Sequence, residues 1–151
     1  MKKILFICHG NICRSPMAEF VMKDLVKKAG LEHEFLIESA GTSREEVGNP
    51  VYPEVRKILW DLGISTEGKY ATQLRKRDYD EYDYLVVMEQ WNIQNMIRII
   101  GQDLEGKIYR LLDFTNNPRD IEDPWYTRNF DKVYEEIVEG CSALLEKIQS
   151  M

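Results

Sequence analysis

Short apolar runs alternate with longer segments of helical periodicity along this chain of 151 residues. The runs 3–8 and 84–88 are continuous and apolar, which is typical of buried strands. Segments 35–39 and 107–112 are read as two further strands, and a long loop, 113–129, precedes the last expected helix. Because strands that alternate with helices form parallel sheets, the pattern predicts an α/β fold with a parallel sheet.

Two of the expected helices carry an apolar face that should pack on the core. The helix over 91–100 presents Ile93, Ile97 and Ile100 on one side. The last helix carries an apolar stripe, and Cys141 on this stripe is expected to be a core residue. The stripe consists of Val133, Ile137, Cys141, Leu144 and Ile148.

The charge of the chain disfavours some classes of function. The formal net charge is −6, which argues against broad nucleic-acid binding, because such binding needs a basic face. An anion site is still compatible with an acidic chain, since backbone N–H groups can hold an anion locally. The apolar run Ile4 to Cys8 is shorter than a signal peptide or a membrane span requires. We therefore expect a cytoplasmic protein with no membrane span.

The cysteines and histidines give no sign of a metal site. The chain has three cysteines, an odd number, which a reducing compartment would keep as thiols. No C-x-x-C pair occurs, and His9 and His33 fit no ligand spacing. His33 stands between two glutamates and is expected at the surface. We expect neither a metal nor another cofactor.

The segment between the first strand and the first helix holds the most unusual residues. A thiol such as Cys8, near a helix N-terminus and Arg14, ionises easily, and the thiolate is a nucleophile. Gly10 and Asn11 tolerate backbone conformations that let consecutive N–H groups converge on one point. Arg14 adds a planar fork that matches two phosphate oxygens, and Ser15 can donate a hydrogen bond to the thiolate. The segment predicts a phosphate cradle with a nucleophile at its base.

Each of these residues also has a purely structural interpretation. Cys8 would then be a buried thiol at a strand end, and Arg14 would be a surface arginine. Asp123 is followed by proline, which is a common turn signal, and Asp113 and Asp120 are rival carboxylates on the same loop. The residue patterns leave these alternatives open.

The stretch ICHGNICRSP at 7–16 closely resembles the signature of the low-molecular-weight protein tyrosine phosphatases. His9 stands where that family usually has leucine. Further resemblances follow in the family's order: SAGT at 39–42, YDYLVVMEQWN at 82–92 and IEDPWY at 121–126. Together these motifs span essentially the whole chain.

This resemblance implies one phosphatase domain over 1–151, a single-domain three-layer αβα fold with a four-stranded parallel twisted sheet. It also implies hydrolysis of phosphotyrosine monoesters, in which Cys8 attacks phosphorus and forms a phosphocysteine. Asp123 would protonate the leaving oxygen and then activate water, while Arg14 and the loop N–H groups bind phosphate. The phosphate-binding residues would be His9, Gly10, Asn11, Ile12, Cys13, Arg14 and Ser15.

The resemblance also implies supporting roles. Asn11, Ser15 and Ser39 would support the loop by hydrogen bonds. Cys13 would trap an oxidised Cys8 as a reversible disulfide, and the alternative is a bystander thiol. The cleft would be walled by His9, Glu45, Trp125 and Tyr126, of which the two aromatics favour Asp123 over its rivals.

Three departures from the family are expected to matter. His9, at a position expected to line the cleft, should alter substrate preference or the acid limb of the pH–rate profile. Glu45 and Glu46 stand near positions where many relatives have Trp-His, so one wall should be more acidic and disfavour acidic peptides. Gly68 or Lys69 stands where some relatives place a supporting histidine, so the support of the loop should differ.

The expected partner is a phosphotyrosine-containing protein, with phosphate or another oxyanion at the site. Phosphoarginine is an alternative substrate. A thiol-dependent arsenate reductase is the nearest rival enzyme, but its chemistry needs further redox cysteines. A catalytically silent phosphotyrosine-binding module is the rival from another class. We expect a monomer, with a weak dimer as the alternative.

Overall fold

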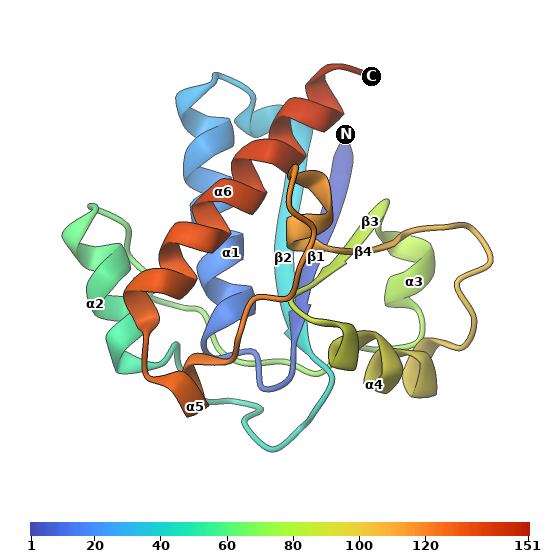
Figure 1. Ribbon diagram of the computed structural model, residues 1–151, viewed down its shortest axis with the longest axis horizontal. Coiled ribbons are helices and arrows are strands. Elements are labelled where there is room, and N and C mark those ends of the chain that lie inside the picture. Colours follow the sequence, from blue (N-terminus) through green and yellow to red (C-terminus); the bar gives the residue numbers. More distant parts are fainter.

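The computed structural model describes residues 1–151, in which strands and helices alternate along the chain (Figure 1). The strands are β1 (Lys2–Cys8), β2 (Phe35–Gly41), β3 (Tyr84–Val87) and β4 (Ile108–Arg110). The α-helices are α1 (Arg14–Lys28), α2 (Pro53–Asp61), α3 (Asp78–Glu81), α4 (Gln90–Ile100), α5 (Pro124–Thr127) and α6 (Phe130–Gln149). Two short 3₁₀ helices complete the fold, η1 (Glu32–Glu34) and η2 (Leu111–Phe114).

The four strands form one sheet in the order β2-β1-β3-β4, and every neighbouring pair is parallel. Ile4 of β1 lies opposite Ile37 of β2 and Tyr84 of β3. Because all four strands run in the same direction, their carboxyl ends meet at one edge of the sheet. Ligands of open α/β sheets bind at this edge.

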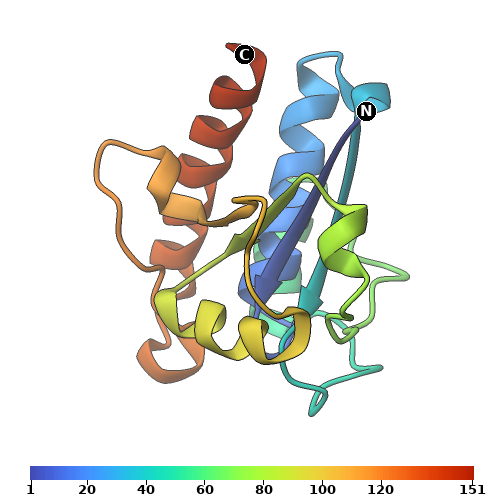
Figure 2. The same ribbon diagram turned by 90° about the vertical axis from the view of Figure 1, so that its right-hand side faces the viewer.

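Helices cover both faces of the sheet, with α1, α2 and α6 on one face and α3 and α4 on the other (Figures 1 and 2). The side chains of β1 alternate between the two faces. Ile4 and Phe6 join the larger core beneath α1 and α6, whereas Leu5 and Ile7 join a smaller core with Met96 of α4. The expected αβα fold with a four-stranded parallel sheet is confirmed.

Packing explains where the elements differ from the predictions. Leu111 and Leu112, expected in the last strand, begin η2 instead and are fully buried in the core that includes α6. Met96 and Ile100 of α4 pack against the sheet, and because they are four residues apart they share one side of the helix. Ile97 was expected on this face, but its side chain is 43% exposed.

Two helices that the sequence did not predict, α3 and α5, have four residues each, too few to show a helical period. Cys141 is fully buried in α6, which confirms it as a core residue, and burial raises the pKa of its thiol. His33 lies exposed in η1, as expected. No helix combines the length and the apolar character that a membrane crossing needs.

Gly140 marks the close approach of α6 to η2. A Cβ at this position would overlap the fully buried side chain of Leu111. Alanine normally stabilises a helix interior by about 1 kcal/mol relative to glycine, but overpacking a core costs about 1–3 kcal/mol. We therefore expect Gly140→Ala to lower the free energy of unfolding by about 1 kcal/mol, measured by urea titration.

Ser142→Ala, at an exposed position of the same helix, is the matched control. It should change the free energy of unfolding by less than about 0.5 kcal/mol. A Gly140→Ala protein more stable than the native one would contradict the close contact with Leu111.

Candidate active site

The loop between β1 and α1 lies at the carboxyl edge of the sheet. Asn11 in this loop has a left-handed backbone, with φ of 59°. The backbone N–H groups of His9, Gly10, Ile12 and Cys13 donate to no atom of the protein. These donors, together with the N-terminus of α1, are therefore available to an oxyanion.

Cys8 ends β1 beneath this loop and is 3% exposed. Its sulfur lies 3.0 Å from Ser15 Oγ, and the N–H of Asn11 donates to it at 3.3 Å. The predicted contact between Ser15 and the thiol is present.

Arg14 is 2% exposed and joins three segments that are distant in the sequence. Its Nη1 donates to the carbonyl of Ile121 at 2.8 Å and lies 3.2 Å from Glu89 Oε1. Its Nη2 lies 3.5 Å from Asp123 Oδ2. Arg14 is therefore not the surface residue of the alternative interpretation. The carboxylates hold its guanidinium beneath the cleft.

Of the three aspartates on the loop before α6, Asp123 is the one that the fold brings to the cleft. The segment before it is tied to the end of β3, because the N–H of Ile121 donates to the carbonyl of Met88 at 2.9 Å. Asp123 has an extended backbone and caps α5, and its Oδ1 accepts the N–H of Trp125 at 2.9 Å. The rivals Asp113 and Asp120 both pair with Arg110 instead, and neither lines the cleft.

The side-chain amide of Asn11 holds the loop from within. Its Nδ2 donates to Ser15 Oγ at 2.8 Å and to Ser39 Oγ at 3.0 Å, while its Oδ1 accepts the N–H of Thr72 at 3.0 Å. Because both hydrogens of the amide are used in this way, the Ser15 oxygen accepts from Asn11. The hydroxyl hydrogen of Ser15 is then free to point at the sulfur of Cys8.

Behind Ser39 stands a buried ionic cluster. The Ser39 hydroxyl donates to Glu19 Oε1 at 2.5 Å, and Glu19 is only 3% exposed. Lys69 Nζ lies 2.9 Å from the same Glu19 oxygen and also donates to the Ser39 carbonyl at 3.1 Å. Lys23 pairs with the other oxygen of Glu19 at 2.6 Å. Of the two residues expected near this support, Lys69 is the one that contacts both Ser39 and Glu19. Glu19 was missed because no motif marks a carboxylate on the covered side of a helix.

Gly41 explains why the turn after β2 can approach the loop. A Cβ at Gly41 would lie 2.7 Å from the carbonyl oxygen of His9 and 3.2 Å from Asn11 Cβ. The N–H groups of Thr42 and Ser43 donate to the carbonyls of Cys8 and His9 at 3.0 and 2.9 Å. The SAGT motif therefore closes the base of the site.

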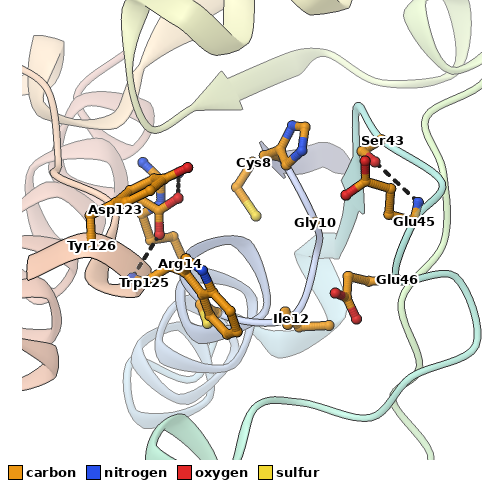
Figure 3. A pocket seen from close by; sticks show the side chains of 12 residues that line it. Cys8, Gly10, Ile12, Arg14, Ser43, Glu45, Glu46, Asp123, Trp125 and Tyr126 are labelled. Carbon is orange, nitrogen blue, oxygen red and sulfur yellow. Dashed lines mark hydrogen bonds and ion pairs between the residues drawn. The ribbon is translucent and has the colours of Figure 1, made fainter. Parts of the chain in front are cut away.

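The cleft above the loop has a volume of about 240 Å³ and two unlike walls, with Cys8 and Arg14 between them (Figure 3). Trp125 is 53% exposed and Tyr126 is 82% exposed, so aromatic faces are open to a ligand. The walls consist of Ile12, Ser43, Glu45 and Glu46 on one side and Asp123, Trp125 and Tyr126 on the other.

His9 also lines the cleft, and its ring contacts that of Trp91 at the start of α4, with 5.0 Å between the centroids. The Nδ1 atom of His9 is buried without a hydrogen-bond partner. Trp91 and Glu89 were not predicted as site residues, although both lie in the quoted stretch 82–92. The turn after β3 brings both of them to the site.

Cys13 is buried at the start of α1, and no disulfide is formed among the three cysteines. Burial raises the pKa of the Cys13 thiol, and the negative charges of Cys8 and Asp123 raise it further. No three histidine, cysteine, aspartate or glutamate side chains are grouped as a metal site would require.

The site combines a thiol beneath free N–H groups with a buried guanidinium and a carboxylate. This arrangement is typical of phosphatases that have a cysteine in the active site. The sequence matches the family of low molecular weight phosphotyrosine protein phosphatases over residues 3–151. A low molecular weight protein-tyrosine-phosphatase of Bacillus subtilis, YfkJ, is 41% identical over 151 residues, covering 99% of this chain and 97% of YfkJ.

Solved structures show the same similarity. The crystal structure of YfkJ matches with a TM-score of 0.95, covering 99% of this chain and 96% of that one. A protein tyrosine phosphatase from Entamoeba histolytica with Hepes in its active site is 28% identical, with a TM-score of 0.90 and coverage of 99% and 98%. An arginine phosphatase from Drosophila is 28% identical, with a TM-score of 0.86 and coverage of 98% of both chains.

The protein is therefore a member of the low molecular weight phosphotyrosine protein phosphatase family.

Lys69 offers a test of the buried cluster. Lys69→Met leaves Glu19 paired only with Lys23 and removes the contact with Ser39. Breaking a buried ion pair destabilises strongly, but because Lys23 remains we expect a loss of about 1–3 kcal/mol in unfolding free energy. The rise in melting temperature caused by inorganic phosphate should also shrink, because the loop is held less firmly.

Lys23→Met is the matched control, because Lys23 pairs with Glu19 but does not touch Ser39 and is 45% exposed. It should leave the phosphate-induced rise close to that of the native protein. Equal effects of the two variants on this rise would contradict the role of Lys69 in supporting the loop.

Proposed function

We propose that this protein hydrolyses phosphotyrosine in proteins through a phosphocysteine formed on Cys8. The observation that carries the proposal is the meeting of Cys8, Arg14 and Asp123 in one cleft, with Arg14 Nη2 at 3.5 Å from Asp123 Oδ2. A nucleophile, a phosphate-binding fork and a proton donor are the three parts that the reaction needs.

In the first step the Cys8 thiolate attacks phosphorus from the base of the cleft. A sulfur–phosphorus bond forms while the bond from phosphorus to the tyrosine oxygen breaks. Asp123 gives its proton to that oxygen, so tyrosine leaves as a neutral phenol. Arg14 and the free loop N–H groups hold the equatorial oxygens, whose charge must be stabilised through the transition state.

In the second step Asp123, now a carboxylate, takes a proton from water. The water oxygen attacks phosphorus, the bond to sulfur breaks, and inorganic phosphate and the Cys8 thiolate are released. Ser15 would support the second step, because its hydroxyl lies 3.0 Å from the sulfur and is free to donate to it as the thiolate departs.

The walls of the cleft favour an aryl leaving group. Ile12 and Trp125 line the same cleft as Cys8, so apolar and aromatic surface is available there to pack against a ring. Phosphoarginine is the second candidate, because the structurally similar Drosophila protein is an arginine phosphatase. The arsenate reductase alternative loses support, since Cys141 is fully buried in α6 and cannot resolve an intermediate on Cys8.

Cys13 adds a redox response to the proposal. Hydrogen peroxide would oxidise the Cys8 thiolate to a sulfenic acid with release of hydroxide. The Cys13 thiol would then displace water to form a Cys8–Cys13 disulfide. Because burial and nearby negative charge raise the pKa of Cys13, the second reaction should be slow at neutral pH and faster in alkaline solution.

The proposed mechanism is tested by hydrolysis of p-nitrophenyl phosphate and of a phosphotyrosine peptide. Cys8→Ser should reduce both to background, because the nucleophile is lost. Asp123→Asn should lower kcat on the peptide by about 10²–10⁴-fold, as expected for a general acid. The same variant should lower kcat less on p-nitrophenyl phosphate, since nitrophenolate is a better leaving group that needs less protonation.

Asp120→Asn makes the same chemical change at a rival carboxylate outside the cleft and is expected to keep most of the activity. Turnover retained by Cys8→Ser would overturn the mechanism, and so would equal losses in the two aspartate variants. Faster hydrolysis of a phosphoarginine peptide than of the phosphotyrosine peptide would favour the second candidate.

The redox proposal predicts a difference between native protein and Cys13→Ser. After brief treatment with hydrogen peroxide, dithiothreitol should restore most of the native activity, because the disulfide protects Cys8 from further oxidation. Cys13→Ser should recover less. Mass spectrometry should find the Cys8–Cys13 disulfide in the native protein, and equal recovery without this disulfide would contradict the proposal.

A further inference from the structure

A second hollow opens beside the catalytic cleft. Its volume is about 470 Å³, and it shares Asp123 and Tyr126 with the cleft. The two hollows therefore lie side by side, with these two residues between them, and a residue next to a phosphotyrosine bound in the cleft would lie near the second one. Its lining residues are Glu89, Trp91, Glu122, Asp123, Tyr126 and Thr127.

Aromatic rings and a carboxylate without a cation give this hollow its chemistry. Trp91 is 48% exposed and Tyr126 is 82% exposed, so both rings are accessible. Glu122 is exposed and pairs with no lysine or arginine. Glu89 also lines the hollow, although one of its oxygens lies 3.2 Å from Arg14. Exposed aromatic faces beside a free carboxylate form a typical site for an ammonium or guanidinium group.

The nearby cations are already engaged elsewhere. Arg128 lies over the rings of Tyr52 and Phe130 and pairs with Glu54, and Arg110 pairs with Asp113 and Asp120. These arginines do not line the hollow. Of the three carboxylates that line the hollow, Glu89 and Asp123 are paired with Arg14, and Glu122 is left without a cation.

The opposite wall of the cleft has the same sign of charge. Glu45 forms no ion pair, and Figure 3 shows its carboxylate on the side of the cleft that faces Asp123. Glu46 accepts a hydrogen bond from Asn49 at 2.6 Å but has no cationic partner. Apart from Arg14 at the base, no lysine or arginine lines either hollow.

We propose that the hollow between Trp91 and Tyr126 is a subsite for a basic side chain, so that the enzyme selects phosphotyrosine flanked by arginine or lysine. The inference rests on the proposed function and names its substrate class. The phosphate is attracted by Arg14 and the loop N–H groups, while the flanking cation is attracted by Glu122 and the two rings. An acidic flanking residue meets like charge on both sides of the cleft.

The experiment compares phosphotyrosine peptides that differ at one position, among the two residues before and the two after phosphotyrosine. Arginine, citrulline and glutamate are placed there in turn, because citrulline keeps the shape of arginine without its charge. At the best position, kcat/KM should be about three- to tenfold higher for arginine than for citrulline, and lowest for glutamate. The preference should shrink at high ionic strength, because the contact is exposed.

The ratio of kcat/KM for arginine to that for citrulline is then measured in variants, since the ratio is insensitive to changes in the chemical step. Glu122→Gln should bring the ratio close to one, and Glu122→Lys should reverse the order so that glutamate is preferred. Glu34→Gln is the matched control, because Glu34 is an exposed glutamate next to the start of β2, at the opposite edge of the sheet. It should keep the native ratio.

Equal rates for all three peptides, or a preference that survives Glu122→Gln, would overturn the inference. Because p-nitrophenyl phosphate has no flanking residue, its hydrolysis by the native protein would then leave the proposed function standing. If the native protein hydrolyses neither p-nitrophenyl phosphate nor any peptide, the proposed function fails and the inference fails with it.

Discussion

The side-chain amide of Asn11 is the contact on which the rest of the site depends. It binds Ser15, Ser39 and the N–H of Thr72, and so joins the loop after β1 to β2 and to the segment after α2. A left-handed backbone at a non-glycine residue is costly, and it persists only where its surroundings hold it. Here three hydrogen bonds hold Asn11, and the neighbouring N–H groups remain free for an anion.

Charge is arranged in layers around this site. In a chain with a net charge of −6, the cation available to an anion in the cleft is Arg14, which is buried beneath it and is fixed by its partners Glu89 and Asp123. Behind the loop, Lys69 balances the buried Glu19. The rim is acidic instead, so under the proposed function a phosphate would be attracted at the base of the cleft and acidic groups would be repelled at its mouth.

Parts of the site differ in how well they could be predicted. Cys8, Gly10, Asn11, Arg14 and Ser15 lie within eight consecutive residues, so their shared position after a strand already indicated a phosphate cradle. Asp123 was one of three aspartates on a loop, and only the resemblance of the stretch 121–126 to the family motif favoured it as the general acid. Glu19, Glu89 and Trp91 were missed, because no local pattern tells which face of a helix or turn will meet a segment far away in the chain. The four-residue helices α3 and α5 were not predicted for a related reason: each contains about one turn, which is too short to show a helical period in the sequence.

The sequence by itself determined an α/β fold with a parallel sheet, the place of the anion loop at the end of β1, and the buried state of Cys141. These features follow from local patterns: apolar runs, helical periods, and residues that permit a tight loop. Only the tertiary structure decided which aspartate reaches Arg14, which lysine supports Ser39, and that Ile97 rather than Met96 faces solvent. These outcomes depend on how distant segments pack, and packing is a property of the whole chain that no short stretch of residues encodes.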